Sequence, residues 1–546
     1  MEKILNKSAF YLSNFYGKTD NEGVVVVKFI SNREDIYQFE CNEAEMLTIF
    51  DTNFHLLKQG NHFELNLTKE MEFLIKVETR QKNKEFFLKI NSIHHEPAVP
   101  YEMMIENKGE NIPLFSQDKI DPLKPSIIEM KKRKGGTYLY SNVPESMPLE
   151  AIDSILMQNK DLVGDCFLTF EHQNASGLPY VYLGYRIVNH QEEDIYVTVR
   201  NVGYQVTGSW LGEKSWMDYY GVKYDIDISS FDEEAMNWFK DYLNFDVDYQ
   251  PKAILPTTYR IPKGKYIYVI GGTSEDAYQN INVNHTADLK IAPRHCVNAN
   301  AFFTITNGKA TGELCAYVDY NKLNQENTII QNLRRYGEKD DLGGRIGQMN
   351  HHGVIDVNPL WVFNDLTPSQ NLPVVYYPYY ADTLKDQYEP FEKIEGSYKH
   401  EYKSDRWLSH LSSQLHHEYI GEDMVEHETI YQGERILLSS NSANPLGKIW
   451  DYGNWMIEYQ ENCVFVNQGD QERKLRFYLL NGGSIYYIIK DESGKILKSG
   501  ATLIHCTGKK EAYECTIKGH SRLIVSVQFV LAANNNGSVE HIVELI

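Results

Sequence analysis

The segment 180–188 constrains the fold of this chain more strongly than any other. Its apolar residues Val181, Leu183, Tyr185 and Ile187 alternate with Tyr182, Gly184 and Arg186. A period of two predicts a β-strand whose two faces differ. Residues 174–177 and 190–193 flank it with the Asn, Ser, Gly and charged residues typical of turns. The surrounding stretch, 135–212, is therefore predicted to contain a series of short strands.

The rest of the chain repeats this pattern. The 546 residues include 38 Tyr, 23 Phe and 7 Trp, and aromatic side chains fit pleated, half-buried surfaces. Further apolar or alternating runs predict strands at residues 24–29, 36–39, 46–50, 73–77, 86–90, 137–140, 266–270, 301–306, 436–438, 476–480, 485–489 and 523–527. We predict a mainly β protein made of several β-sandwich domains, with a few packing helices in the middle region.

The length predicts two to four domains. We expect a small β-sandwich over residues 1–100, a Pro-rich linker over 101–134 and a large β-rich central domain with helical insertions over 135–385. A His-rich helical connector over 386–430 and a C-terminal β-sandwich over 431–546 would complete the chain.

Three segments carry helix signals and one carries a hairpin signal. Pro148 opens a predicted helix over 148–157, where proline in the first turn loses no hydrogen bond. Ser230 and Glu233 form a capping box before an apolar stripe that runs to Leu243. Residues 404–415 predict the helix of the connector. Asn307-Gly308 between two strand patterns predicts a hairpin turn.

Charge and hydropathy exclude several partners. With 54 basic and 75 acidic side chains the net charge is −21, and the longest basic run, 131–134, is interpreted as part of the linker. We therefore expect no nucleic-acid partner and no membrane span. The first seven residues do not resemble a signal peptide. This predicts synthesis in the cytoplasm, and any display on the cell or spore surface would require release by another route.

The seven cysteines form no CxxC pair, which excludes a zinc ribbon and a thioredoxin motif. Cys506 and Cys515 flank a predicted turn and could face each other. Because cores of this size need no staple, we expect all seven to be reduced.

No motif predicts a catalytic residue, a metal ligand or a cofactor. His416, His417 and His427 are the densest potential metal ligands, but HExxH spacing is absent and surface histidines explain the set better. The carboxylate pairs Asp225/Asp227 and Asp246/Asp248 could bind Ca²⁺ or serve as the acid and base of a glycosidase. They also suit the solvated face of edge strands, where charge deters aggregation.

Several motifs of the middle region resemble the uncharacterised β-rich region of Gram-positive secreted stalk-domain proteins, which bear a copper amine oxidase N-terminal-like module. The resemblance covers about residues 135–500. Its motifs are residues 138–142 (YLYSN), 144–145 (PE), 172–174 (HQN), 182–189, 197–203 (VTVRNVG), 260–264 (RIPKG), 352–353 (HG) with Asp356, 453–454 (GN) with 456–459 (MIEY), and 481–483 (NGG). The resemblance implies no catalytic residues. Residues 20–95 also resemble the small pre-peptidase C-terminal-type β-sandwich.

These observations favour a non-catalytic bacterial structural or interaction protein that self-assembles or binds a protein partner through Tyr-rich β surfaces. The alternative is a carbohydrate-binding or carbohydrate-processing protein of the cell surface. Its candidate residues are four tryptophans expected near loops and the two carboxylate pairs: Trp210, Trp216, Trp361, Trp455, Asp225, Asp227, Asp246 and Asp248.

Overall fold

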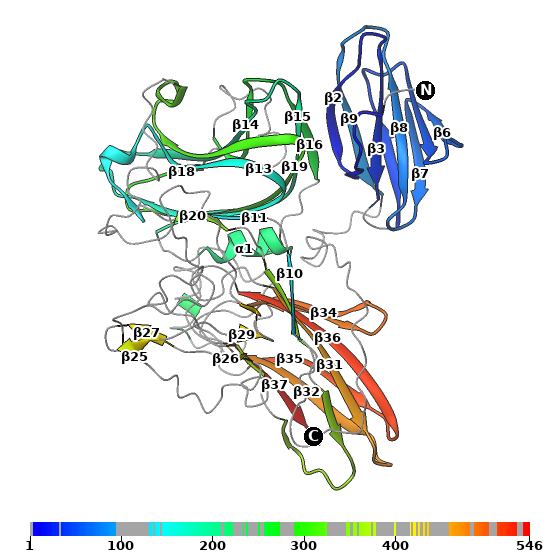
Figure 1. The fold of residues 1–546 in the computed structure, drawn as a ribbon, viewed down its shortest axis with the longest axis vertical. Helices are drawn as coiled ribbons and strands as arrows, with labels where there is room; N and C mark the ends of the chain where they lie inside the picture. Colours follow the sequence, from blue (N-terminus) through cyan, green and yellow to red (C-terminus); the bar gives the residue numbers. More distant parts are fainter. Residues whose placement is uncertain are drawn as a thin grey trace. The chain divides into compact units, whose positions relative to one another are not determined.

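β-Strands dominate the protein, which confirms the predicted fold class (Figure 1). The computed structural model describes residues 4–31, 34–93, 130–134, 137–141, 145–208, 212–221, 233, 236–237, 249–251, 256–272, 289–324, 346–349, 353–357, 360–372, 375–377, 398–399, 415–416, 419–421, 424–425, 430–431, 434–435, 458–480, 485–501, 510–531 and 539–546. Contacts divide the chain into two units. The first contains residues 1–104, 139–221 and 251–346, and the second contains 105–138, 222–250 and 347–546.

The first unit begins with a small sandwich. One layer has the strand order β1 (Phe10–Tyr11), β3 (Val24–Ile30), β8 (Glu72–Glu78), β5 (Met46–Asp51) and β6 (Leu56–Gly60). The other contains β2 (Asn14–Lys18), β9 (Glu85–Ser92), β4 (Asp35–Glu40) and β7 (His62–Leu67). Alternate residues of both layers form one apolar core, which includes Phe15, Phe29, Phe39 and Phe73.

Strand β2 connects this sandwich to the central region of the same unit. Asn14 to Tyr16 pair in parallel with Thr257 to Tyr259 of β16 (Thr257–Ile261), so the hydrogen-bonded sheet continues from one region into the other. Side chains of the two regions also contact each other at this junction. Ser13 Oγ lies 2.8 Å from Thr258 Oγ1, and Phe15 stacks on Tyr196 with ring centroids 5.7 Å apart.

Arg200 adds a second link between these regions. Its guanidinium lies 4.0 Å from the ring centre of Tyr11 and 4.4 Å from that of Phe302. A cation held near two aromatic rings is attracted to both, by about 0.5–2 kcal/mol each depending on desolvation. The small sandwich and the central sheet are therefore joined by backbone pairing, ring stacking and cation–π contacts together.

Two long antiparallel strands, β13 (Ser154–Asn174) and β19 (Cys296–Tyr317), form the middle of the central region. On the edge of β19 away from β13, β15 (Ile195–Thr207) pairs with the first half of β19 and carries β16. Along the second half of the same edge, β14 (Val181–Val188) pairs with β19, and β14 also pairs with β17 (Tyr266–Gly271) and β18 (Leu289–Ile291). The predicted apolar face of β14 lies in the core, since Val181, Leu183, Tyr185 and Ile187 are all buried there.

The hairpin prediction at Asn307-Gly308 was wrong. β19 runs through both residues as one strand, and each adopts a positive φ. The pairing with β13 is irregular here, with register shifts between Asn159 and Gly164. The two residues with positive φ therefore make a bulge in a continuous strand, which bends it without reversing the chain.

The helix predicted over 148–157 is also absent. Only a 3-10 turn, η3 (Leu149–Ala151), forms, and β13 begins at Ser154. Residues Ser154 and Ile155 pair with Ala316 and Cys315 of β19, so tertiary pairing overrides the local helix signal. At the second predicted helix, the structure describes Glu233, Met236 and Asn237, which are helical.

One helix was not predicted. Helix α1 (Glu213–Tyr220) covers β15 and is capped by Gly221 in the left-handed conformation, φ 65°. Its buried Trp216, Tyr219 and Tyr220 follow the i, i+3, i+4 spacing of a helix face. Gly203 of β15 allows the close approach, because a Cβ atom there would lie 1.9 Å from the Ser215 carbonyl oxygen.

The second unit contains a C-terminal sandwich. One sheet has the order β10 (Met130–Lys134), β21 (Gly353–Val357), β31 (Glu458–Asn467), β36 (Ser521–Leu531), β33 (Ile485–Asp491) and β34 (Ile496–Ala501), with β22 (Leu360–Phe363) also paired to β31. The other contains β23 (Gln370–Asn371), β37 (Val539–Leu545), β32 (Arg473–Leu480) and β35 (Lys510–Ile517), with β24 (Val375–Tyr377) paired to β37. Side chains of both sheets form a shared core.

Two predictions about connecting segments need correction. The basic run at 131–134 belongs to strand β10 rather than to a linker, and among the described strands β10 stands at the end of its sheet. In the segment 386–430, the described residues form short strands: β25 (Tyr398–Lys399), β26 (Leu415–His416), β27 (Tyr419–Gly421), β28 (Met424–Val425) and the start of β29 (Ile430–Tyr431). Residues 404–414 of the predicted helix lie outside the described residues, and Leu415, its last residue, is in β26.

None of the described helices has the length and apolar character needed to cross a membrane.

Candidate functional site

The residues proposed from the sequence as sugar contacts do not gather at one described site. Trp216 lies in α1 and Trp361 in β22, and both are almost completely buried. The Trp361 ring stacks on Phe465 at 5.0 Å in the core of the C-terminal sandwich. Trp210, Trp455, Asp225, Asp227, Asp246 and Asp248 lie outside the described residues. Of the predicted histidine set, His416 lies in β26, whereas His417 and His427 also lie outside them.

A layer of polar side chains lies between α1 and the central sheet. Asn300 of β19 donates to Ser215 Oγ at 2.7 Å and accepts from Thr169 Oγ1 at 2.8 Å. Glu171 of β13 accepts from Asn298 Nδ2, and also from the Tyr140 hydroxyl at 3.1 Å. These groups are buried and bonded to one another, so the layer fixes the helix on the sheet.

Arg186 and Glu313 form a buried ion pair on neighbouring central strands. Arg186 Nε donates to Glu313 Oε2 at 2.7 Å, and both side chains are less than a tenth exposed. The guanidinium also donates to the Asn324 side chain and the Leu323 carbonyl, and it lies 4.7 Å from the Tyr266 ring centre. Because the donors of Arg186 are occupied in this way, the pair is structural.

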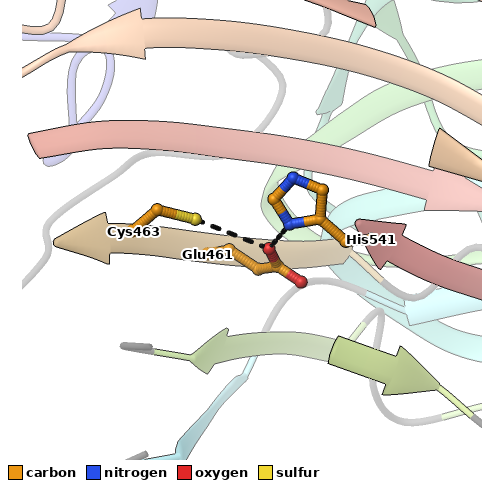
Figure 2. A group of neighbouring side chains, drawn as sticks. All are labelled: Glu461, Cys463 and His541. Carbon is orange, nitrogen blue, oxygen red and sulfur yellow. Dashed lines mark hydrogen bonds and ion pairs between the residues drawn. The ribbon is translucent and has the colours of Figure 1, made fainter. Parts of the chain in front are cut away.

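The most unusual group lies in the C-terminal sandwich, where Glu461, Cys463 and His541 meet (Figure 2). Glu461 and Cys463 are two residues apart on β31, so their side chains share the inner face of one sheet. His541 comes from β37 of the other sheet. Each side chain offers a ligand atom, and these atoms all lie within 4.8 Å of one another.

One carboxylate oxygen is the meeting point of this group. Glu461 Oε2 pairs with His541 Nδ1 and accepts a contact from Cys463 Sγ at 3.7 Å, as Figure 2 shows. The Phe477 ring stacks on the imidazole with centroids 5.7 Å apart. The other imidazole nitrogen, Nε2, is buried and has no hydrogen-bond partner among the described residues. All three side chains are at most 1% exposed.

Burial, and then the Glu461 carboxylate, raise the pKa of the Cys463 thiol well above its usual value. Burial also raises the pKa of Cys41 and of Cys515 to about 12, and it raises the pKa of Cys166 as well. The six described cysteines (41, 166, 296, 315, 463 and 515) are free thiols, and Cys506 lies outside the described residues.

These pKa directions predict an unreactive set of thiols. At pH 8 we expect iodoacetamide to leave the peptides of Cys166 and Cys463 unmodified in the native protein, because the thiolate is the nucleophile and both sulfurs are buried. Both should react fully in guanidinium chloride, and mass spectrometry of the digested protein measures this. Rapid native labelling of either cysteine would contradict their burial.

The Glu461–Cys463–His541 group was not predicted from the sequence. Its local signal is Glu-x-Cys on a strand, which places two metal-ligand types on one face. The third member is 80 residues from Glu461, and only the packing of the two sheets brings it close.

Comparisons with known proteins identify no relative. No family model matches the chain, and no curated protein is significantly similar to it. A solved anti-sigma factor domain-containing protein is 12% identical over 55% of this chain and 77% of its own, with a TM-score of 0.09. The tandem CBM22 domains of Paenibacillus barcinonensis Xyn10C are 11% identical over 54% and 84%, with a TM-score of 0.11. The multicopper oxidase Fet3p, described as functioning in iron import, is 8% identical over 95% and 85%, also with a TM-score of 0.11. These scores are too low to support any functional argument.

Proposed function

We propose that this protein is a non-catalytic structural or interaction protein whose β-sandwiches bind further copies of the chain through their edge strands. The observation that carries this proposal is the combination, at two strands, of unpaired backbone and exposed apolar side chains. The first is β6 in the N-terminal sandwich, and the second is β34 in the C-terminal sandwich.

In the part of the chain that the structure describes, β6 pairs only with β5, and β34 pairs only with β33. Each therefore presents one row of backbone donors and acceptors to an incoming strand. Leu56 at the start of β6 is 56% exposed, and Phe54 just before it is 47% exposed. Ile496 and Leu497 open β34 with 37% and 36% exposure. The sequence of the edge strand β10 differs, because it contains four basic residues, and such residues are common on edge strands that do not pair further.

The chemistry of the described interior is consistent with a role in binding. Three of the polar groups that the structure brings together are buried: the polar layer under α1, the Arg186–Glu313 pair and the Glu461 group. A substrate in solution has no contact with such groups. The resemblance of residues 135–500 to stalk-domain proteins adds a location to the proposal, the bacterial cell surface.

Carbohydrate binding is the second hypothesis. The burial of Trp216 and Trp361 removes two of its candidate stacking residues, since an indole must be open to solvent to stack on a sugar. Carbohydrate binding then depends on the other candidate tryptophans and aspartates, which lie outside the described residues. A glycan array probed with the purified full-length chain tests it, and a reproducible hit would favour it over edge pairing.

Edge pairing predicts the effect of a charge placed on each edge. We expect Leu56→Glu and Ile496→Glu to shift the concentration for half-assembly upward by roughly tenfold or more, because a new contact then buries a carboxylate. Sedimentation velocity over a wide concentration range measures the shift. Leu366→Glu is the matched control, because Leu366 is 91% exposed but lies in the turn between β22 and β23. Equal behaviour of all three variants and the wild type would refute edge pairing.

A further inference from the structure

Glu461, Cys463 and His541 provide three chemically different donors at one point inside the C-terminal sandwich. A carboxylate, a thiolate and an imidazole together are the donors that zinc accepts, whereas Ca²⁺ and Mg²⁺ prefer oxygen alone. Here the thiol and the imidazole converge on one carboxylate oxygen with Phe477 stacked behind the imidazole.

The spacing of the donors suits a small tetrahedral ion. Bond lengths of about 2.3 Å to sulfur and about 2.0–2.1 Å to nitrogen or oxygen place neighbouring ligands roughly 3.3–3.7 Å apart. Cys463 Sγ and Glu461 Oε2 already lie 3.7 Å apart. His541 Nδ1 and Glu461 Oε2 are hydrogen bonded, so a small rotation of the two side chains has to separate them before an ion can lie between them.

The charges also match. A thiolate and a carboxylate carry two negative charges, and a neutral imidazole carries none, so a divalent cation leaves the occupied group neutral. Neutrality matters here because the side chains are at most 1% exposed, and an uncompensated charge in such a place is costly. Cys463 releases its thiol proton to solvent when the ion binds, since the thiolate is the ligand.

We propose that Glu461, Cys463 and His541 bind a structural divalent transition metal ion, with zinc the best match. Among the described residues they supply three of the four ligands of a tetrahedral site. Glu461 and Cys463 lie in one sheet of the sandwich and His541 in the other. The ion therefore fastens the two sheets, β31 to β37, across the core. Because the site is sealed, the ion enters as the sandwich folds.

Cobalt provides a test on the wild-type protein. The full chain is unfolded in guanidinium chloride with a chelator, and then refolded with one equivalent of Co²⁺. We expect the visible bands of tetrahedral cobalt together with a near-ultraviolet thiolate-to-cobalt charge-transfer band, and one ion per chain by elemental analysis. A refolded protein without the charge-transfer band would overturn the proposal, because Cys463 would then not be a ligand.

Variants separate this site from adventitious binding. Chains expressed in zinc-supplemented medium should retain roughly tenfold less zinc, or less still, when they carry Cys463→Ser or Glu461→Gln. Cys41→Ser, a buried cysteine of the small sandwich in the first unit, is the matched control and should retain the wild-type amount. Undiminished zinc in Cys463→Ser would mean that other histidines hold the ion and would refute the assignment. If a variant does not fold, the cobalt spectrum of the wild-type protein still shows whether Cys463 is a metal ligand.

Discussion

Replacing Glu313 with alanine should destabilise the first unit by about 3–5 kcal/mol, the typical effect of removing one partner of a buried ion pair. Glu313 accepts from Arg186 Nε at 2.7 Å and from Gln158 at 2.9 Å. Without the carboxylate, the Arg186 guanidinium stays in the interior with its charge uncompensated by Glu313. Urea denaturation followed by circular dichroism measures the change in the free energy of unfolding.

Two controls make this result specific. The double variant Arg186→Met/Glu313→Leu removes both charges and should recover much of the lost stability, because apolar side chains can replace a buried pair. Glu192→Ala breaks an exposed pair with Lys263 and should have no measurable effect. A Glu313→Ala protein as stable as the wild type would show that the pair is not buried as described.

Replacing Phe15 with alanine should also cost about 3–5 kcal/mol, from lost burial and the cavity that remains. Phe15 is fully buried in β2 and contacts Phe10, Phe29 and Phe86 within the small sandwich, and Tyr196 on β15. The cavity therefore opens where the two regions of the first unit join. Hydrogen exchange should accelerate in β9 and in β15 together.

Phe73→Ala provides the comparison for this prediction. Phe73 is equally buried in the same core and packs on Phe29 and Phe39, without a ring contact to Tyr196. It should weaken the small sandwich while β15 keeps its protection. If Phe15→Ala also left β15 unchanged, the pairing of β2 with β16 would not couple the regions.

Local sequence patterns were sufficient to predict where strands form, but they did not predict which strands pair with each other. The alternation in residues 180–188 correctly predicted which face of β14 lies in the apolar core, because side chains two residues apart share a face of a strand. The opposite face is also largely buried, which the alternation did not indicate. The helix predicted at Pro148 and the hairpin predicted at Asn307-Gly308 were wrong because both predictions used neighbouring residues alone. Long-range pairing of β13 with β19 determines the structure at both places.

The candidate metal site could not have been predicted for the same reason. Glu461 and Cys463 share a face by sequence spacing alone, but His541 joins them only after β32 pairs with β37 and the two sheets pack. Helix α1 was different. Its aromatic residues at i, i+3 and i+4 and its terminal glycines, Gly212 and Gly221, are local features that the sequence alone contains.

Hydrogen exchange at the edge strands tests the proposed function most directly. Among the described residues, no strand pairs with β6 or β34 on the sides that face away from β5 and β33. Mass spectrometry of the full chain should show these peptides exchanging freely in dilute solution and becoming protected as the concentration rises, while peptides of β3 stay unchanged. Exchange in β6 and β34 that is the same at every concentration would contradict assembly through these edges.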